Sequence, residues 1–217
     1  MRIGMMMKWK IPPPNARVAN EARTLMTAGH KIFFLIEGRP GEAREESMNG
    51  LNVVRGVRMS APREIWHRCT FNFTYRDPLW AKAIERFVRE HSIDVLHVND
   101  LPLVGEAVVA GRRMGLPVVA DLHENYPAGL QVRHANRLAK ATIYAYGRWA
   151  RYERAALRDV EAIVVANEES RDRLVDLGVG EEKISVVPDT ATVRPGEVPV
   201  DPELVELYRR LATMRKA

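Results

Sequence analysis

A histidine at the end of an apolar run is the residue of this sequence best placed to do chemistry. His123 closes the run PVVADLH over residues 117–123, and carboxylates stand close to it at Asp121 and Glu124. A neighbouring carboxylate selects one imidazole tautomer and raises the imidazole pKa, which suits a group that donates a hydrogen bond or handles a proton. A histidine that ends a strand can equally be satisfied by backbone atoms. Both roles remain open at this point.

Polar side chains follow several other apolar runs of the chain. In an open sheet of parallel strands, ligands bind in the crevice beyond the carboxyl ends of the strands, so these positions share one rim. The residues that follow the first, fourth and fifth runs are Asn15 and Arg17, Asn99 and Asp100, and Glu124 and Asn125. Later runs end in Asn167-Glu168-Glu169 and Pro188-Asp189. The sequence therefore predicts a binding site at this rim.

Metal and cofactor chemistry has little support in the sequence. His97 lies inside the apolar run 93–99, which favours a core histidine. A metal site built from His97, Asp100, His123 and Glu124 would lack tight ligand spacing, so we expect no metal. Cys69 is the only cysteine, which excludes an intrachain disulfide and a cysteine zinc cluster. The chain also lacks the G-x-G-x-x-G, Walker A, G-x-S-x-G and H-E-x-x-H motifs, and we expect no cofactor.

The elements that would position these groups alternate along the chain. Strand-like runs occupy 2–7, 31–36, 51–57, 93–99, 117–123, 162–167 and 183–188. Helical spacing occupies 15–28, 79–90, 103–114, 136–158 and 168–177. This alternation predicts a doubly wound, Rossmann-like α/β fold with a parallel sheet of about six or seven strands. Because the runs 93–99 and 117–123 are unbroken, we expect them to be adjacent near the sheet centre.

Two stretches lack this alternation. Residues 60–78 show no convincing helix or strand, and connections of that length are usually functional or mobile. Residues 190–202 carry recurring prolines and are typical of a linker, after which Asp201 can cap a short helix from Pro202 to Met214. We therefore expect one Rossmann-like domain over 1–189, followed by a linker and a short C-terminal helix over 190–217.

The charge of the chain favours anionic partners. Its 33 basic and 28 acidic residues give a net charge of +5. The stretch 131–158 is rich in arginine, tyrosine and tryptophan, and either docks on anionic lipid headgroups or forms a solvated helix whose aromatics pack on the sheet. Nucleic-acid binding is disfavoured because no recognition motif accompanies the charge. No stretch can cross a bilayer, and the lone cysteine makes the cytoplasm the default location, with peripheral contact at the inner membrane face as the docking alternative.

Three segments in order resemble family 4 glycosyltransferases of the GT-B fold. Residues 15–35, NARVANEARTLMTAGHKIFFL, are similar to the first helix and second strand of that family. Residues 94–127 contain H-V-N-D and D-L-H-E, which resemble the ends of its fourth and fifth strands. Residues 152–189 resemble the helix, strand and V-V-P-N ending that close its N-terminal domain, although Asp189 replaces the usual asparagine. The resemblance spans nearly the whole chain.

The resemblance implies a retaining hexosyltransferase that moves a sugar from a nucleotide diphosphate sugar to a carbohydrate or lipid-linked acceptor. It makes His123 the catalytic residue that lines the donor sugar. It assigns substrate binding to the rim residues Asn15, Arg17, Asn99, Asp100, Glu124 and Asn125. Prolines 12–14 stand where many members carry glycines. We expect the C-terminal domain that holds the donor to be missing from this chain, and the chain alone to be incomplete or inactive. The alternative is a non-catalytic module that binds an acceptor or docks on a partner.

Overall fold

A computed structural model describes residues 1–8, 16–48, 50–188 and 201–214. The strands are β1 (Arg2–Met6), β2 (Lys31–Gly38), β3 (Glu45–Met48), β4 (Leu51–Arg58), β5 (Val95–Asn99), β6 (Val118–Leu122), β7 (Ala162–Val165) and β8 (Ile184–Val186). The helices are α1 (Ala16–Thr27), α2 (Ala61–Thr74), α3 (Pro78–His91), α4 (Val104–Met114), α5 (Tyr126–Arg133), α6 (Arg137–Ala141), α7 (Tyr146–Leu157), α8 (Glu168–Asp176) and α9 (Pro202–Met214). Short 3-10 helices are η1 (Leu101–Leu103) and η2 (Glu181–Lys183).

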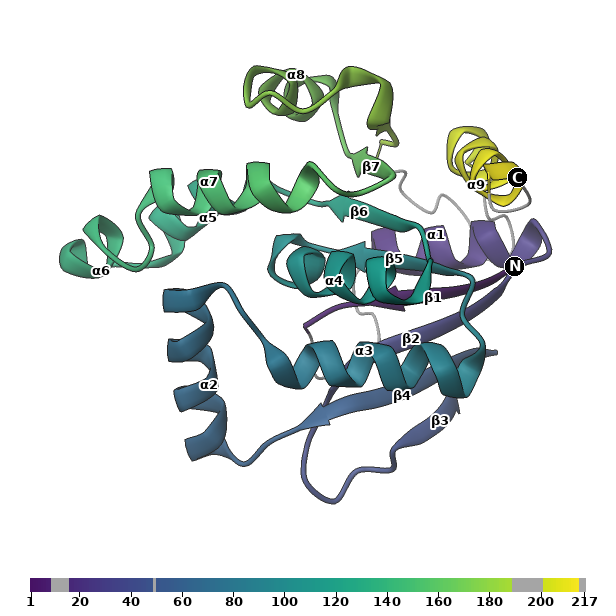
Figure 1. Ribbon diagram of the computed structural model, residues 1–217, viewed down its shortest axis with the longest axis horizontal. Coiled ribbons are helices and arrows are strands. Elements are labelled where there is room, and N and C mark those ends of the chain that lie inside the picture. Colours follow the sequence, from purple (N-terminus) through teal and green to yellow (C-terminus); the bar gives the residue numbers. More distant parts are fainter. Residues whose placement is uncertain (9–15, 49, 189–200, 215–217) are drawn as a thin grey trace.

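One sheet with helices on both faces forms the body of the protein (Figure 1). Its strand order is β3-β4-β2-β1-β5-β6-β7-β8, and every neighbouring pair except β3–β4 is parallel. Helices α3, α4 and α7 bury Trp80, Ala107 and Trp149 against one face. Helices α1 and α9 bury Leu25 and Tyr208 against the other. The predicted doubly wound α/β fold is confirmed, and it places the carboxyl ends of β1, β5 and β6 at one end of the sheet.

The centre of the sheet agrees with the prediction from the sequence, whereas one edge of the sheet differs from it. β5 and β6 pair in parallel in the interior of the sheet, as their unbroken apolar runs predict. The sheet has eight strands, one more than the upper end of the prediction. The added strand is β3, which pairs antiparallel with β4 at the edge. Its residues are mostly exposed, so no apolar run announces it.

Two helical regions differ from the sequence prediction. Residues 60–78, where no element is expected, contain α2, whose apolar Ile65 and Trp66 point to solvent and so do not form an inward-facing stripe. The single long helix expected over 136–158 is divided into α6 and α7, with α5 before them. Trp149 and Tyr152 of α7 pack among core residues, as in the second interpretation of this basic stretch.

The C-terminal helix α9 covers the range that the sequence predicts, Pro202–Met214. It packs against α1 and β8. Residues 189–200 of the expected linker lie outside the described residues, and the division into a domain and a linker stays a prediction. None of the described helices is both long enough and apolar enough to cross a membrane.

Candidate functional site

A cleft of about 830 Å³ lies at the carboxyl ends of the central strands. This volume is in the range of small-molecule sites. Its floor follows β5 and β6, and α2 and α5 contribute opposite walls. The lining residues are Lys8, Glu37, Met59, Glu64, His67, Arg68, Phe71, Asn72, Asn99, Asp100, Pro102, Leu103, His123, Glu124, Tyr126, Leu130, Arg133, His134 and Tyr144.

The structure brings four of the predicted site residues together in this cleft: Asn99, Asp100, His123 and Glu124. Arg17 instead lies beneath the cleft, with its side chain 4% exposed. Asn125 accepts a hydrogen bond from the backbone N–H of Ala128 and so caps α5. Asn15 lies outside the described residues.

His123 and Asp121 form the best-defined polar pair of the site. The imidazole Nε2 lies 2.7 Å from Oδ2 of Asp121, which is fully buried. An ionised carboxylate only accepts hydrogen bonds, so Nε2 carries a proton and donates a hydrogen bond to Asp121. Nδ1, on the other side of the ring, lies 3.8 Å from Oδ1 of Asp100. That nitrogen can accept a hydrogen bond from a ligand when the ring is neutral and donate one when the ring is charged.

A buried network supports Asp121 from below. Arg17 places Nη2 3.0 Å from Oδ1 of Asp121 and donates through Nη1 to the backbone oxygen of Val187 at 2.9 Å. His97 Nε2 lies 3.7 Å from Asp121, and its Nδ1 lies 2.5 Å from the hydroxyl of Tyr208 on α9. His97 is therefore a core histidine, as its place within an apolar run predicts. Helix α1 therefore contacts Asp121, the residue that orients His123, whereas α9 is linked to Asp121 only through His97.

The buried acidic groups of this network also have a geometry that could suit a cation. Ligating atoms of Glu21, His97 and Asp121 lie within 4.8 Å of one another. The guanidinium of Arg17, however, lies 3.0 Å from each of the two carboxylates. Because this permanent positive charge already pairs with both carboxylates, we assign the cluster to an internal ion-pair network.

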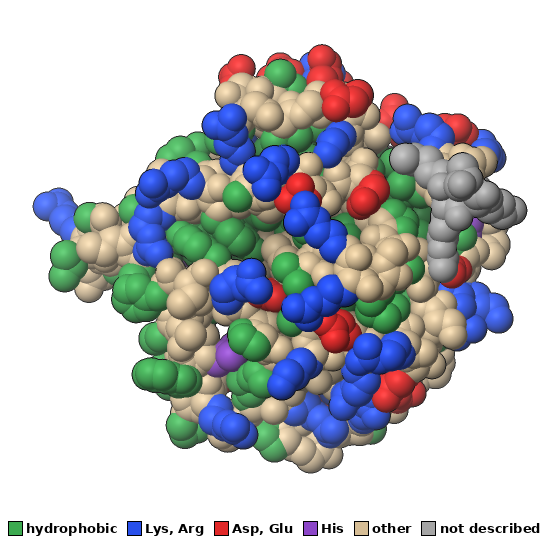
Figure 2. All heavy atoms as spheres, in the orientation of Figure 1, with side chains coloured by type: hydrophobic (Ala, Val, Ile, Leu, Met, Phe, Trp, Pro, Cys, Tyr) green, Lys and Arg blue, Asp and Glu red, His purple; other side chains and the backbone are tan. Residues whose placement is uncertain are grey.

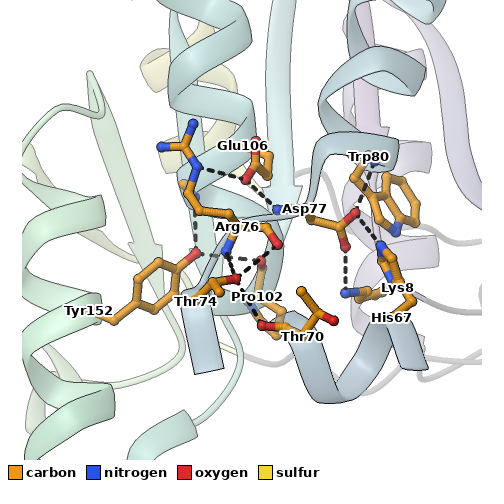
Figure 3. Close-up of polar contacts among 11 residues, drawn as sticks. Lys8, His67, Thr70, Thr74, Arg76, Asp77, Trp80, Pro102, Glu106 and Tyr152 are labelled. Carbon is orange, nitrogen blue, oxygen red and sulfur yellow. Dashed lines mark hydrogen bonds and ion pairs between the residues drawn. The ribbon is translucent and has the colours of Figure 1, made fainter. Parts of the chain in front are cut away.

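Asp77 holds two lining residues of the cleft, Lys8 and His67, in place (Figure 3). Its carboxylate accepts from Nζ of Lys8 at 2.9 Å, lies 2.7 Å from Nε2 of His67, and caps α3 through the backbone N–H of Trp80. Sequence reasoning did not select Lys8, His67 or Arg68 for the site. Two of the three belong to α2, which the sequence pattern did not predict.

The floor of the cleft combines backbone strain with an unsatisfied acceptor. Asp100 has φ 68° and ψ 152°, a region that residues other than glycine rarely adopt and that clusters at functional sites. Asn99 is buried, and its Oδ1 has no hydrogen-bond partner among the described residues. Acids and bases are mixed along the walls, so the cleft offers donors and acceptors for a polyhydroxylated ligand.

The pKa values of the two central groups move apart. Burial alone raises the pKa of the Asp121 carboxyl, but its hydrogen bond with His123, the interaction with His97 and the charge of Arg17 hold that pKa well below its usual value. Burial lowers the pKa of His123, but the hydrogen bond and negative charge of Asp121, with the charge of Asp100, outweigh it and raise the pKa. The pair favours a charged imidazole at the cleft.

We expect this charge to be visible by nuclear magnetic resonance. Titration of the imidazole signals should give His123 a midpoint above 6.5, whereas burial and the N-terminal charge should give His30 a midpoint below 6.5. The pKa of His123 is higher in the folded protein than in the unfolded chain. Its contribution to stability is therefore complete below pH 6.5 and is lost as the pH rises through the pKa of the folded protein. A His123→Gln variant assigns the signal, and a midpoint at or below 6.5 would contradict the pairing.

Comparisons with known proteins agree with the fold. The family model Glycosyltransferase Family 4 matches residues 15–190. Sucrose-phosphate synthase from Thermosynechococcus elongatus is 11% identical with a TM-score of 0.60, over 88% of this chain and 48% of that chain. HepE from Anabaena, solved with UDP-glucose, is 11% identical with a TM-score of 0.54, over 88% and 44%. UDP-GlcNAc 2-epimerase from Methanocaldococcus jannaschii is 11% identical with a TM-score of 0.50, over 86% and 45%.

These likenesses show a Rossmann-like domain of the GT-B architecture. At this level of identity the solved structures speak for the fold alone, and an epimerase shares it with transferases. The chain spans about half the length of each of these three structures. No curated protein sequence matches it.

Proposed function

Because the chain belongs to Glycosyltransferase Family 4, we propose that it is the acceptor-side domain of an enzyme that transfers a hexose from a nucleotide diphosphate sugar to an acceptor hydroxyl, with retention of anomeric configuration. The observation that carries the proposal is the His123–Asp121 pair, which places an imidazole in a cleft at the strand ends where doubly wound folds bind ligands. The acceptor is a carbohydrate or a lipid-linked sugar.

In this proposal His123 is the catalytic residue. Its imidazole, held by Asp121, donates a hydrogen bond to the donor sugar or stabilises negative charge near the departing phosphate. Asn99 and Asp100 bind the acceptor from the cleft floor, and Glu124 binds it from the rim. Asn15, which follows the first apolar run in the sequence, contributes to the same site.

The structure changes how Arg17 and Asn125 fit this proposal. Arg17 is buried against Asp121, so it supports the site by holding the carboxylate that orients His123. Asn125 supports it by starting α5, the helix that carries Tyr126 and Arg133 into the cleft wall.

A second domain completes the proposed enzyme, in the same chain or in another. It supplies the basic groups that grip the donor pyrophosphate, so neither a metal nor a cofactor is required. Residues 1–189 form the acceptor-side domain, and 190–217 form the linker and C-terminal helix. We place the enzyme in the cytoplasm, with a peripheral contact at the inner face of the membrane.

Isothermal titration calorimetry tests the division of labour. The isolated chain should bind uridine and guanosine diphosphate sugars more weakly than micromolar, because the groups that hold the pyrophosphate belong to the second domain. A micromolar dissociation constant for any of these donors would show that the donor site is already present. Supplying the second domain should produce sugar transfer, and its failure with every donor would favour the non-catalytic acceptor-binding module.

A further inference from the structure

The inner face of α2 is held firmly against the protein. Phe71 is buried and meets the ring of Trp149 at 6.1 Å in an edge-on arrangement. His67 is bonded to Asp77, as Figure 3 shows. The guanidinium of Arg148 donates to the backbone oxygen of Phe73 at 3.1 Å. These contacts fix the rotation of α2 about its own axis. Specific packing therefore determines which of its side chains face the solvent.

That outer face is apolar. Ile65 is 56% exposed, Trp66 is 76% exposed and Phe73 is 62% exposed. With 3.6 residues per turn, these side chains and the exposed Cys69 fall within an arc of about 100°. A surface helix normally turns such a stripe inward. A cluster of large apolar side chains exposed to solvent is typical of a surface that binds a membrane or another protein.

Positive charges border the stripe. On α2, Arg63 and Arg68 fall on opposite sides of the apolar arc. On α6, Arg137 and Lys140 accompany Leu138, which is 73% exposed. Within the described part of the chain, no ion pair is recorded for any of these four cations. Figure 2 shows hydrophobic and basic side chains together along the edge of the molecule where Figure 1 places α2 and α6.

Helix α2 and the segment that leads into α6 both border the cleft. Arg68, from α2, and His134, between α5 and α6, both line it. Cations from three helices, Arg133, Lys140 and Arg68, lie near the imidazole of His134. Burial and then the charges of these three cations lower the pKa of His134. Their mutual repulsion is relieved when anions approach.

We propose that this α2–α6 surface, made of Arg63, Ile65, Trp66, Arg68, Cys69, Phe73, Arg137, Leu138 and Lys140, docks the protein on an anionic lipid bilayer. Apolar side chains enter the boundary of the acyl region while the arginines and lysine meet headgroup phosphates. Charge complementarity selects this occupant, because an anionic bilayer offers an apolar phase and negative charge side by side. The docking does not require sugar transfer, so binding tests it independently of the proposed function.

Flotation with phosphatidylglycerol–phosphatidylcholine vesicles tests the proposal directly. The chain should float with these vesicles at low salt and remain behind with pure phosphatidylcholine, and high salt should release it. Trp66→Ala should weaken binding about ten-fold or more, since a large apolar side chain no longer enters the interface. Exchanging both Arg63 and Arg68 for glutamine should weaken it about five-fold per charge. A fluorophore on Cys69, the only cysteine, should brighten on binding.

Matched variants on other helices provide the controls. Val175→Ser removes a 37% exposed apolar side chain from α8, and Lys82→Gln removes an exposed charge from α3. Both variants should bind vesicles as the unmodified chain does. All variants should show the same circular dichroism spectrum as the unmodified chain. Three results would each overturn the proposal. The chain could fail to bind anionic vesicles at low salt, or Val175→Ser could weaken vesicle binding as much as Trp66→Ala does. The third is self-association of the chain that depends on Trp66 and occurs without vesicle binding.

Discussion

Replacing His123 with alanine should lower the turnover of the completed enzyme by roughly ten- to a thousand-fold, the range for loss of one positioned polar or proton-handling group. The imidazole lies at the cleft, and its raised pKa favours the charged form that stabilises a departing phosphate. Turnover is measured with the donor domain supplied, at saturating donor and acceptor. The loss should appear mainly in kcat, because the interaction strengthens as charge develops on the leaving group.

Stability measurements separate this role from a structural one. A residue at a site rim should be dispensable for folding, but the His123 side chain is only 13% exposed and donates to a buried carboxylate. Alanine should therefore also cost about 1–3 kcal/mol of stability. The control His30→Ala changes a histidine distant from the cleft and should leave turnover intact. Severe destabilisation with normal turnover in the folded fraction would make His123 structural, and attention would pass to Asn99 and Asp100.

Much of the site's location follows from local patterns in the sequence. β5 and β6 are short apolar runs, and the residues directly after them, Asp100 and His123, necessarily emerge at one end of a parallel sheet. The core position of His97 follows from the same reasoning. Such predictions need only the residue types within one run and the handedness of the crossovers.

The remaining features depend on contacts between distant segments. Tyr208 meets His97 across 111 residues of sequence, and Arg17 meets Asp121 across 104. No periodicity specifies such pairs. Arg17 is predicted as a ligand contact because it follows the first strand, yet the turn of α1 directs it inward to Asp121. Helix α2 escapes prediction for another reason: its exposed stripe is apolar, so the signal that identifies an ordinary amphipathic helix is missing.

The Asp121→Asn substitution should be the most destabilising conservative change in the site. Asp121 is fully buried and contacts Arg17, His123 and His97. Removing its charge leaves the buried guanidinium without one of its partners, and breaking a buried pair in this way costs about 3–5 kcal/mol. For a domain of this size that corresponds to a fall of about 10 °C in melting temperature. Chemical and thermal unfolding of both proteins measure the difference.

The pH dependence of that difference distinguishes lost ion pairing from altered packing. Because the pKa of Asp121 is lowered, this carboxylate contributes stability above pH 3.8, and that contribution is lost on acidification. Because the pKa of His123 is raised, this imidazole contributes stability below pH 6.5, and that contribution is lost as the pH rises. The gap in unfolding free energy should therefore be widest between these values and narrow on both sides. The exposed carboxylate of Asp172 provides the control, since Asp172→Asn should leave the melting temperature unchanged. A gap that stays constant from pH 3 to 9 would mean that Asp121 acts through shape alone, and the charged His123 assigned to the cleft would lose its support.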